Sequence, residues 1–221
     1  MREEDKLLQG LVYCPTVPEL MRLKARAHRL NLEYNRCLDE ETEARQRILR
    51  ELIGEMGEDG YIQGPLYMQY GSHTRIGKGF FANFNLNIQD DGRVTIGDYC
   101  DFGPNVTIVT ALHPMLSGER LALPDDEGRL RRMCYAKPVR IGNACWLGSN
   151  VTVGPGVTIG NNCVIGAGSL VLRDIPDGSF AAGSPCRVIR AIGDGDSLRH
   201  REEVLGPALR TYFAQRQRPE E

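Results

Sequence analysis

The sequence has no long hydrophobic run. No stretch of its 221 residues approaches the ~18 to 20 consecutive apolar residues that a membrane-spanning helix needs. The opening MREEDKLLQG is acidic and lacks the apolar core of a secretory signal peptide. These absences predict a cytoplasmic protein that does not act at a membrane.

An excess of either charge is also missing. The chain has 27 Lys and Arg residues against 29 Asp and Glu residues, a net charge of -2 at pH 7. Its one dense basic cluster, Arg129, Arg131 and Arg132, lies in a polar segment, where we expect a solvated face. No nucleic-acid partner is therefore expected.

Paired cysteine motifs are absent. None of the seven cysteines forms a Cys-x-x-Cys pair, and their odd number argues against a complete disulfide framework. We expect reduced thiols, with Cys145 and Cys163 buried because they occupy small, inward-facing positions of the repeat described next.

What the sequence does contain is a repeat with a period of six residues. An aliphatic residue recurs at six consecutive steps, at Ile141, Leu147, Val153, Ile159, Ile165 and Val171. Glycine follows the first five of them. An earlier run from Tyr70 to Ile108 obeys the same rule, with a slip of two residues after Ile88. The polar segment 110–140 separates the two runs.

A period of six fits neither a helix nor a simple alternating strand. It predicts a coil of three short strands, each ending in a corner, with coils stacked about 4.8 Å apart. We expect the glycines to supply the unusual backbone angles of the corners, with four asparagines as substitutes in left-handed conformations. The asparagines are Asn143, Asn150, Asn161 and Asn162.

Both ends of the chain are expected to be helical. Two helices are predicted within residues 16–56, the first capped by Thr16 with Glu19, the second capped by Asp39 and stopped by Gly57. A third helix is predicted at 197–217. The expected organisation is an N-terminal helical segment at 1–58, the coil domain at 59–190 with an inserted loop at 110–140, and a C-terminal helical tail at 191–221.

His113 is the histidine whose position is most suggestive. It lies where the first run of repeats gives way to the insertion, and Pro114 restricts its backbone to extended conformations. Imidazole titrates near neutral pH and can act there as a general base. Position alone leaves a functional and a structural role for His113 equally open.

Four short motifs around His113 carry a resemblance to a known family. They are Phe81-Ala-Asn-Phe-Asn85, Asp90-Asp91, Gly103-Pro-Asn-Val106 and His113-Pro114. In this order and spacing they resemble the maltose and galactoside O-acetyltransferases and their nodulation relatives, which are hexapeptide-repeat acyltransferases. The resemblance implies an all-β main domain, a left-handed parallel β-helix with an N-terminal helical segment and a short C-terminal helix. It also implies a homotrimer with active sites between subunits.

The resemblance assigns roles to individual residues. His113 would be the general base in the transfer of an acetyl group from acetyl-CoA to a hydroxyl group, without a metal ion. Asn83 would position the reacting groups or help stabilise the transition state, and Asp91, Gln69 and Phe81 would contact the acceptor. Acetyl-CoA would follow Ser149, Ala167, Leu172 and Arg173, with Arg187 and Arg190 suited to its phosphates. Trp146, the only tryptophan, is expected to point outward and to contact cofactor or acceptor.

Three departures from the family pattern leave the acceptor open. The family's N-terminal acidic residue is missing near Pro15, Gln69 replaces serine or aspartate, and Phe81 replaces tyrosine. The insertion between Pro114 and Pro138 is longer than in those relatives and is predicted to shape the acceptor pocket. An N-acetyltransferase or antibiotic-modifying enzyme on the same fold, and a scaffold without catalysis, are the alternatives. A zinc-dependent carbonic anhydrase would need a third histidine near the coils.

Overall fold

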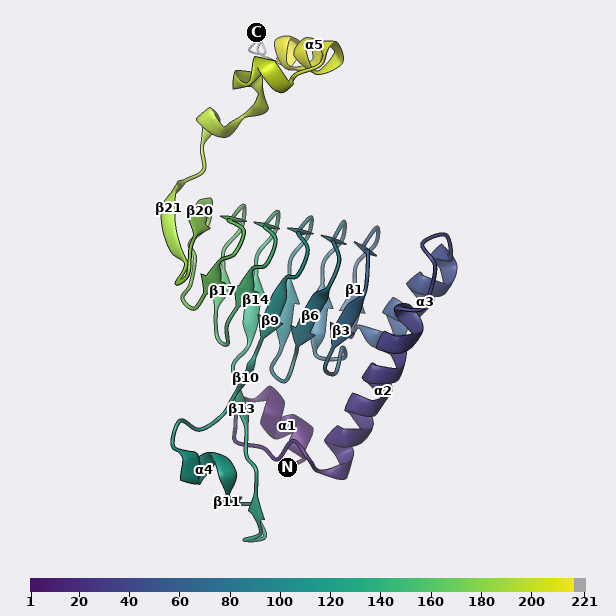
Figure 1. Ribbon diagram of the computed structural model, residues 1–221, viewed down its shortest axis with the longest axis vertical. Helices are drawn as coiled ribbons and strands as arrows, with labels where there is room; N and C mark the ends of the chain where they lie inside the picture. Colours follow the sequence, from purple (N-terminus) through teal and green to yellow (C-terminus); the bar gives the residue numbers. More distant parts are fainter. Residues whose placement is uncertain (217–221) are drawn as a thin grey trace.

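The computed structural model describes residues 1–216. It shows a prism of stacked coils with helices against its first coil, an arm that leaves the prism near its middle and a C-terminal tail (Figure 1). Within these residues no helix has the length and apolar character needed to cross a membrane.

The prism has three faces, named here sheets I, II and III. Sheet I contains β1 (Glu55–Met56), β4 (Thr74–Ile76), β7 (Val94–Ile96), β14 (Val139–Ile141) and β17 (Thr158–Ile159). Sheet II contains β2 (Tyr61–Ile62), β5 (Phe81–Ala82), β8 (Asp101–Phe102), β15 (Trp146–Leu147), β18 (Val164–Ile165), β20 (Ser179–Ala182) and the antiparallel β21 (Arg187–Ala191). Sheet III contains β3 (Leu66–Met68), β6 (Leu86–Gln89), β9 (Thr107–Val109), β16 (Thr152–Val153) and β19 (Leu170–Val171). The chain visits the three sheets in turn, so the predicted parallel β-helix is confirmed.

The six-residue repeat is the stacking register of this prism. On sheet II, Phe102 pairs with Leu147 and Leu147 pairs with Ile165 in neighbouring coils. All three side chains are at most 1% exposed. A fully buried aliphatic side chain contributes about 1.5–3 kcal/mol. The repeat therefore predicts the core because each aliphatic residue packs on its equivalent one coil away.

The predicted role of the repeat glycines is confirmed at Gly71, which has a φ of 70°, but is wrong for the five glycines of the second run, none of which has positive φ. Gly142 and Gly148 do not have positive φ. A Cβ atom on either would lie 2.7 Å from backbone atoms of the next coil, closer than real Cβ atoms approach. These glycines are required by the close approach of successive corners rather than by unusual backbone angles.

The asparagines of the corners divide into two kinds. Asn150 and Asn162 have φ of 59° and 55°, as predicted. Asn143 and Asn161 do not adopt left-handed angles, so that part of the prediction is wrong. Their side chains instead link coils: the Asn143 backbone N–H donates to Oδ1 of Asn161 at 2.9 Å. Asn143 Oδ1 accepts from the Asp98 N–H at 2.8 Å.

Three N-terminal helices precede the coils. They are α1 (Glu3–Leu8), α2 (Pro18–Tyr34) and α3 (Thr42–Leu52), of which α1 was not predicted. The predicted caps are wrong: α2 begins after Val17, and α3 begins after Glu41, without a capping side chain at either. Asp39 instead accepts a 2.9 Å hydrogen bond from the buried Arg45 guanidinium. Helix α3 also ends before the predicted stop at Gly57, because Glu55–Met56 already forms β1.

The insertion is an ordered arm rather than an irregular loop. It contains β10 (Ala111–Leu112), α4 (Ser117–Leu121), β11 (Leu123–Pro124), β12 (Leu130–Arg131) and β13 (Tyr135–Ala136). Strand β10 pairs antiparallel with β13, and β11 pairs antiparallel with β12. The arm therefore leaves and rejoins the prism through one short two-stranded ladder at its base.

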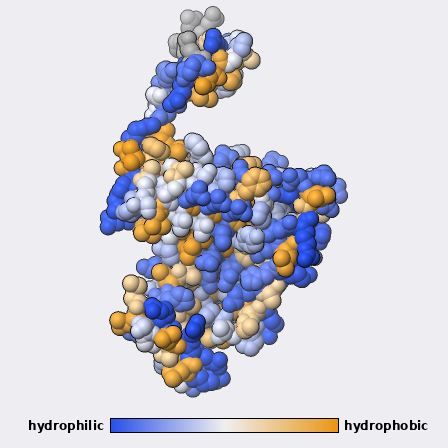
Figure 2. Space-filling model, viewed as in Figure 1, coloured by the Kyte–Doolittle hydropathy of each residue, from blue (hydrophilic) through white to orange (hydrophobic). Residues whose placement is uncertain are grey.

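The C-terminal tail is broken where one helix was predicted. Three 3-10 turns, η1 (Asp194–Asp196), η2 (Leu198–His200) and η3 (Glu202–Val204), precede α5 (Pro207–Arg216). The predicted end of the helix at residue 217 and the last residues of the tail lie outside the described part. Figure 2 shows this tail standing apart from the main body.

The cysteines are free thiols, as predicted. Cys145 and Cys163 are buried at 1% and 0% exposure. The Cys145 thiol donates to the Gly160 carbonyl at 3.0 Å, and the Cys163 thiol donates to the Pro176 carbonyl at 3.1 Å. These thiols fill the corner between sheets I and II and are part of the core.

Candidate functional site

His113 stands at the base of the arm, directly after β10. Its imidazole is exposed, and its Nδ1 atom lies 3.4 Å from Sγ of Cys134. The contact follows from the ladder register, in which Leu112 faces Tyr135, so the residues flanking that pair are brought together. One imidazole nitrogen is thus held by the protein, and the other remains available.

The backbone of Cys134 is hydrogen-bonded to the N-terminal segment. Its backbone N–H and carbonyl exchange two 2.9 Å hydrogen bonds with those of Tyr13. The thiol side chain is buried, and burial together with the nearby Asp91 carboxylate raises the pKa of Cys134 to about 11. Cys134 is therefore a protonated thiol at neutral pH and a rigid support for His113.

Asp91 lies in the same cluster, at a buried turn after β6. Its Oδ1 accepts a 2.6 Å hydrogen bond from the Tyr13 hydroxyl, and the side chain is only 6% exposed. Burial raises the pKa of the Tyr13 phenol, so it remains a hydrogen-bond donor. Oδ2 of Asp91 has no hydrogen-bond partner in residues 1–216. One carboxylate oxygen is therefore committed to the fold.

Asp90 and His73 build the turn beneath that cluster. Asp90 accepts hydrogen bonds from the Tyr70 N–H at 2.8 Å and the Thr74 hydroxyl at 2.9 Å, and burial raises the pKa of its carboxyl group. His73 is held through both of its ring nitrogens. Its Nδ1 lies 2.8 Å from the Asp90 carbonyl and its Nε2 lies 3.3 Å from Glu4. His73 is structural.

The predicted site residues fall on two different edges of the prism. The corners between sheets III and I, called edge III–I, carry Gln69, Asp91, His113, Leu172 and Arg173. The corners between sheets II and III, called edge II–III, carry Asn83, Ser149 and Ala167. The strands of sheet III separate the two edges, and β6 alone covers about 13 Å at ~3.3 Å per residue. His113 and Asn83 therefore do not meet within one chain.

The outer face of sheet II carries a third group of predicted residues. Phe81, Trp146 and Arg190 lie in one row, linked by the pairing of successive strands. Trp146 is 56% exposed, so the prediction that it points outward is confirmed. Phe81 stacks on Tyr61 with ring centroids 6.1 Å apart.

The two arginines predicted to meet phosphates differ in availability. Arg190 forms an ion pair with Asp196, with hydrogen bonds of 2.6 and 2.7 Å, and also lies over the Phe180 ring. Arg187 donates only to the carbonyl of Cys186, within the described residues. Arg187 is therefore free to pair with an anion, whereas Arg190 would have to leave Asp196.

Sequence reasoning missed two contributors to the His113 cluster, Tyr13 and Cys134. Neither belongs to the six-residue repeat or to the four motifs around His113. The only local signal for Cys134 is its place shortly before Pro138, where the chain rejoins the coils. Among residues 1–216 no group of three or more His, Cys, Asp and Glu side chains is arranged to hold a metal ion.

Comparisons with known proteins agree with this architecture. Residues 6–57 match the maltose acetyltransferase hexapeptide capping motif, and residues 138–173 match six repeats of the bacterial transferase hexapeptide. The galactoside O-acetyltransferase of Escherichia coli strain K12 is 41% identical over 87% of this chain and 90% of its own length. Nodulation protein L of Rhizobium meliloti is 39% identical over 84% of this chain and 97% of its own length.

Solved structures give the same result. A galactoside acetyltransferase in complex with coenzyme A superposes with a TM-score of 0.80 and 41% identity, covering 89% of this chain and 94% of that one. A maltose O-acetyltransferase from Clostridium difficile 630 gives a TM-score of 0.81 and 37% identity, covering 88% and 99%. The fold and the repeat define the class: an acetyl-CoA-dependent acyltransferase built on hexapeptide repeats. Within that class, the chain belongs to the family of galactoside and maltose O-acetyltransferases.

Proposed function

We propose that this protein transfers the acetyl group of acetyl-CoA to a hydroxyl group of a neutral sugar or sugar-like acceptor, with His113 as general base. The observation that carries the proposal is the contact between His113 Nδ1 and Cys134 Sγ, 3.4 Å long, at the base of the arm. It holds an exposed imidazole by one nitrogen and leaves Nε2 to face a substrate. Asp91 and Gln69 lie on the same edge III–I and can contact the acceptor there.

The direction of the hydrogen bond between Cys134 and His113 decides how His113 can act. If the thiol donated its proton to Nδ1, the ring would carry its own proton on Nε2 and could not accept another. The proposal requires the other arrangement, in which Nδ1–H donates to the sulfur and Nε2 has a free lone pair. When Nε2 takes the proton of the acceptor hydroxyl, the resulting imidazolium strengthens the Nδ1–H···S hydrogen bond.

The co-substrate supplies an acetyl thioester. As His113 removes the hydroxyl proton, the acceptor oxygen forms a bond to the carbonyl carbon and the carbon–sulfur bond breaks. The imidazolium then returns its proton to the departing thiolate. Asn83 would support the negative charge that develops on the carbonyl oxygen. Its Oδ1 accepts the Phe84 N–H at 2.8 Å, which leaves Nδ2 as the available donor.

A complete site needs residues from two copies of the chain. His113 is on edge III–I and Asn83 on edge II–III, so the two edges must face each other across a subunit boundary. This arrangement supports the expected homotrimer, because a closed ring pairs each edge III–I with a neighbour's edge II–III. Acetyl-CoA would then lie between Ser149 and Ala167 of one copy and Leu172 and Arg173 of the next.

Neutral hydroxyl acceptors are favoured by the relatives, whose names specify galactosides and maltose. The altered Pro15, Gln69 and Phe81 indicate that the acceptor of this protein differs in detail. The hydrogen bond from Tyr13 leaves only Oδ2 of Asp91 to contact an acceptor hydroxyl. Transfer to an amino group is the second candidate.

Three further expectations stay predictions. They are the cytoplasmic location, the reaction without a metal ion, and the domain boundaries at residues 58 and 190.

Removing the Cys134 thiol should reduce turnover without removing the base. We expect Cys134→Ala to lower kcat about tenfold, because an imidazole free to rotate spends little time in the reactive orientation. Cys134→Ser should keep most of the activity, and KM for acetyl-CoA should be unchanged in both. The pH profile of kcat and the thermal melting curve are the measurements.

The matched control is Cys163→Ala, which removes a buried thiol at the corner between sheets I and II. It should cost stability but leave the pH profile of kcat as it is. Equal kcat values in Cys134→Ala and the unaltered protein would show that the thiol does not position His113.

A panel of acceptors tests the proposed function. The purified protein is incubated with acetyl-CoA and neutral glycosides, amino sugars or aminocyclitols, while release of free thiol and the mass of the product are followed. We expect acetylation of neutral glycosides on oxygen. Transfer confined to amino groups would overturn the proposed acceptor class and favour the second candidate.

A further inference from the structure

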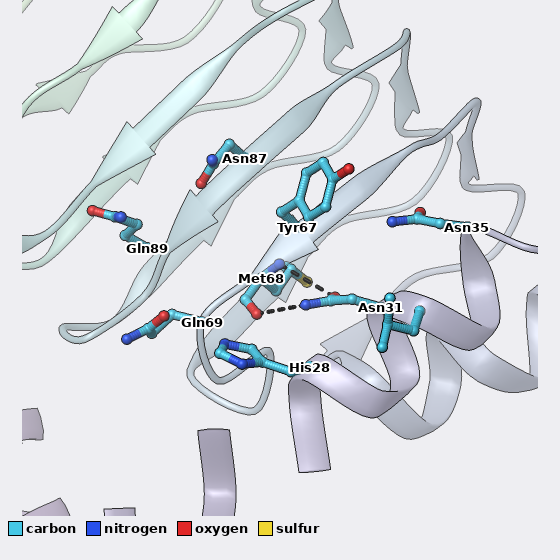
Figure 3. Close-up of a pocket in the computed structure, with 9 residues that line it drawn as sticks. His28, Asn31, Asn35, Tyr67, Met68, Gln69, Asn87 and Gln89 are labelled. Atoms are coloured by element: carbon cyan, nitrogen blue, oxygen red, sulfur yellow. Dashed lines mark hydrogen bonds between the residues drawn. The ribbon is translucent and has the colours of Figure 1, made fainter. Parts of the chain in front are cut away.

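A cavity of about 390 Å³ lies between α2 and the outer face of sheet III, at the first two coils. Figure 3 shows side chains from α2 facing side chains from β3 and β6 across it. Its volume is in the range of pockets that hold small molecules. Of the residues proposed to contact the acceptor beside His113, Gln69 also lines this cavity.

The helical wall of this cavity is fastened to the coils by two asparagine side chains. Asn31 Nδ2 donates to the Met68 carbonyl at 2.8 Å, and Asn35 Nδ2 donates to the Leu66 carbonyl at 2.9 Å (Figure 3 shows the first). Their Oδ1 atoms accept from the N–H groups of the same two residues, at 3.3 and 2.7 Å. The amides bridge α2 to strand β3, so the cavity is preformed.

The other polar groups around the cavity are unused. Tyr67, Gln69, Asn87 and Gln89, together with His28, line it, and in the described part of the chain their side chains make no hydrogen bond. Among residues 1–216, no Asp, Glu, Lys or Arg lines the cavity. Tyr67 is 49% exposed, and its ring stands off strand β3 (Figure 3).

These groups suit a neutral, polyhydroxylated ligand. Amides donate and accept hydrogen bonds, which matches hydroxyl groups that do both. A half-exposed tyrosine offers an apolar face with a polar tip. A phosphate or nucleotide would call for arginine or lysine, and the described residues that line this cavity include neither.

The cavity continues into the edge that carries the general base. Gln89 is the last residue of β6 and pairs with Val109 of β9, and the chain reaches His113 four residues later. Gln69 lies beside Gln89 in the preceding coil, about 4.8 Å away by strand spacing. A ligand in the cavity can therefore extend along edge III–I toward Asp91.

We propose that this cavity is a second acceptor subsite, which holds a neutral sugar unit attached to the one that is acetylated. The proposal rests on the proposed function, since it assigns the acetylated unit to the His113 cluster. It names the acceptor as an oligosaccharide or extended glycoside rather than a single sugar. Tyr67 stacks on the second unit, and Asn87 and Gln89 bind its hydroxyl groups.

The test compares a short and a long acceptor in Tyr67→Ala and Asn87→Ala. The probes are methyl glucoside and maltotriose, with acetyl-CoA and thiol release as the assay. We expect kcat/KM for maltotriose to fall about tenfold in each variant, while that for methyl glucoside changes less than about twofold. Tyr99→Ala is the matched control, because Tyr99 is a similarly exposed tyrosine at the corner between sheets I and II.

Several results would overturn the subsite. One is an equal loss of kcat/KM for both acceptors, and another is no loss of kcat/KM for maltotriose. A third is a changed sedimentation coefficient of Tyr67→Ala, which would mean that another copy of the chain covers the cavity. If the unaltered protein acetylates neither sugar, neither of them is its acceptor, and calorimetric titration with maltotriose decides the subsite separately. Binding that Tyr67→Ala abolishes would support it, and no binding by the unaltered protein would refute it.

Discussion

His113→Ala is expected to reduce kcat/KM for acetyl transfer by about 10²- to 10⁴-fold, the usual contribution of a general base. The loss should occur without unfolding, because the imidazole is exposed and its hydrogen bond to Cys134 is long. The measurement is thiol release with the accepted glycoside, beside a thermal melt followed by circular dichroism. Tm should stay within about a degree or two of the unaltered protein.

His200→Ala is the control for this variant. His200 is exposed and lies on a 3-10 turn of the C-terminal tail, where it contacts Asp194 at 3.2 Å. It should retain full activity. Undiminished turnover in His113→Ala would rule out His113 as the base and with it the proposed mechanism.

Asn83→Asp should lose about 10²- to 10³-fold in kcat, the typical cost of removing one donor to a developing oxyanion. The aspartate keeps an oxygen that can accept the Phe84 N–H, so the local turn is preserved. It has no N–H to donate and adds a negative charge where negative charge develops. Steady-state kinetics with both substrates would show the loss in kcat rather than in KM for acetyl-CoA.

Asn83→Ala serves as its companion, since it removes the donor without adding charge. Both variants should be poorly active, with the aspartate no better than the alanine. If Asn83→Asp keeps normal turnover, the amide N–H does not support the reaction, and Asn83 is only a turn residue.

The sequence predicts the prism because its core is a local pattern repeated. Residues such as Leu147 and Ile165 are six-residue multiples apart and pack on each other, so one rule covers every coil. The sequence does not show in the same way why glycine is required after each aliphatic residue. Gly148 approaches Ala167 of the next coil, and only the stacked structure shows how little room is left there.

The motif residues of the candidate site could be predicted from the sequence, but the residues that hold them in place could not. His113 stands out by position and resemblance, whereas Cys134 lies 21 residues away and reaches it through the ladder at the base of the arm. Tyr13 reaches the same cluster from the N-terminus, 78 residues before its partner Asp91. Contacts of this kind depend on tertiary packing, which leaves no periodic trace in the sequence.

The division of the site between two edges also became visible only with the fold. Asn83 and His113 look like members of one cluster along the sequence, yet sheet III lies between them. The catalytic unit in this account is therefore a pair of neighbouring copies.

The most direct measurement of this claim is complementation between two inactive variants. His113→Ala and Asn83→Ala are unfolded together, refolded as a mixture in equal amounts and assayed for acetyl transfer. In a closed ring about one quarter of the subunit boundaries would combine an intact His113 with an intact Asn83, so about one quarter of normal activity should return. A mixture no more active than the two variants refolded separately would contradict an active site shared between subunits.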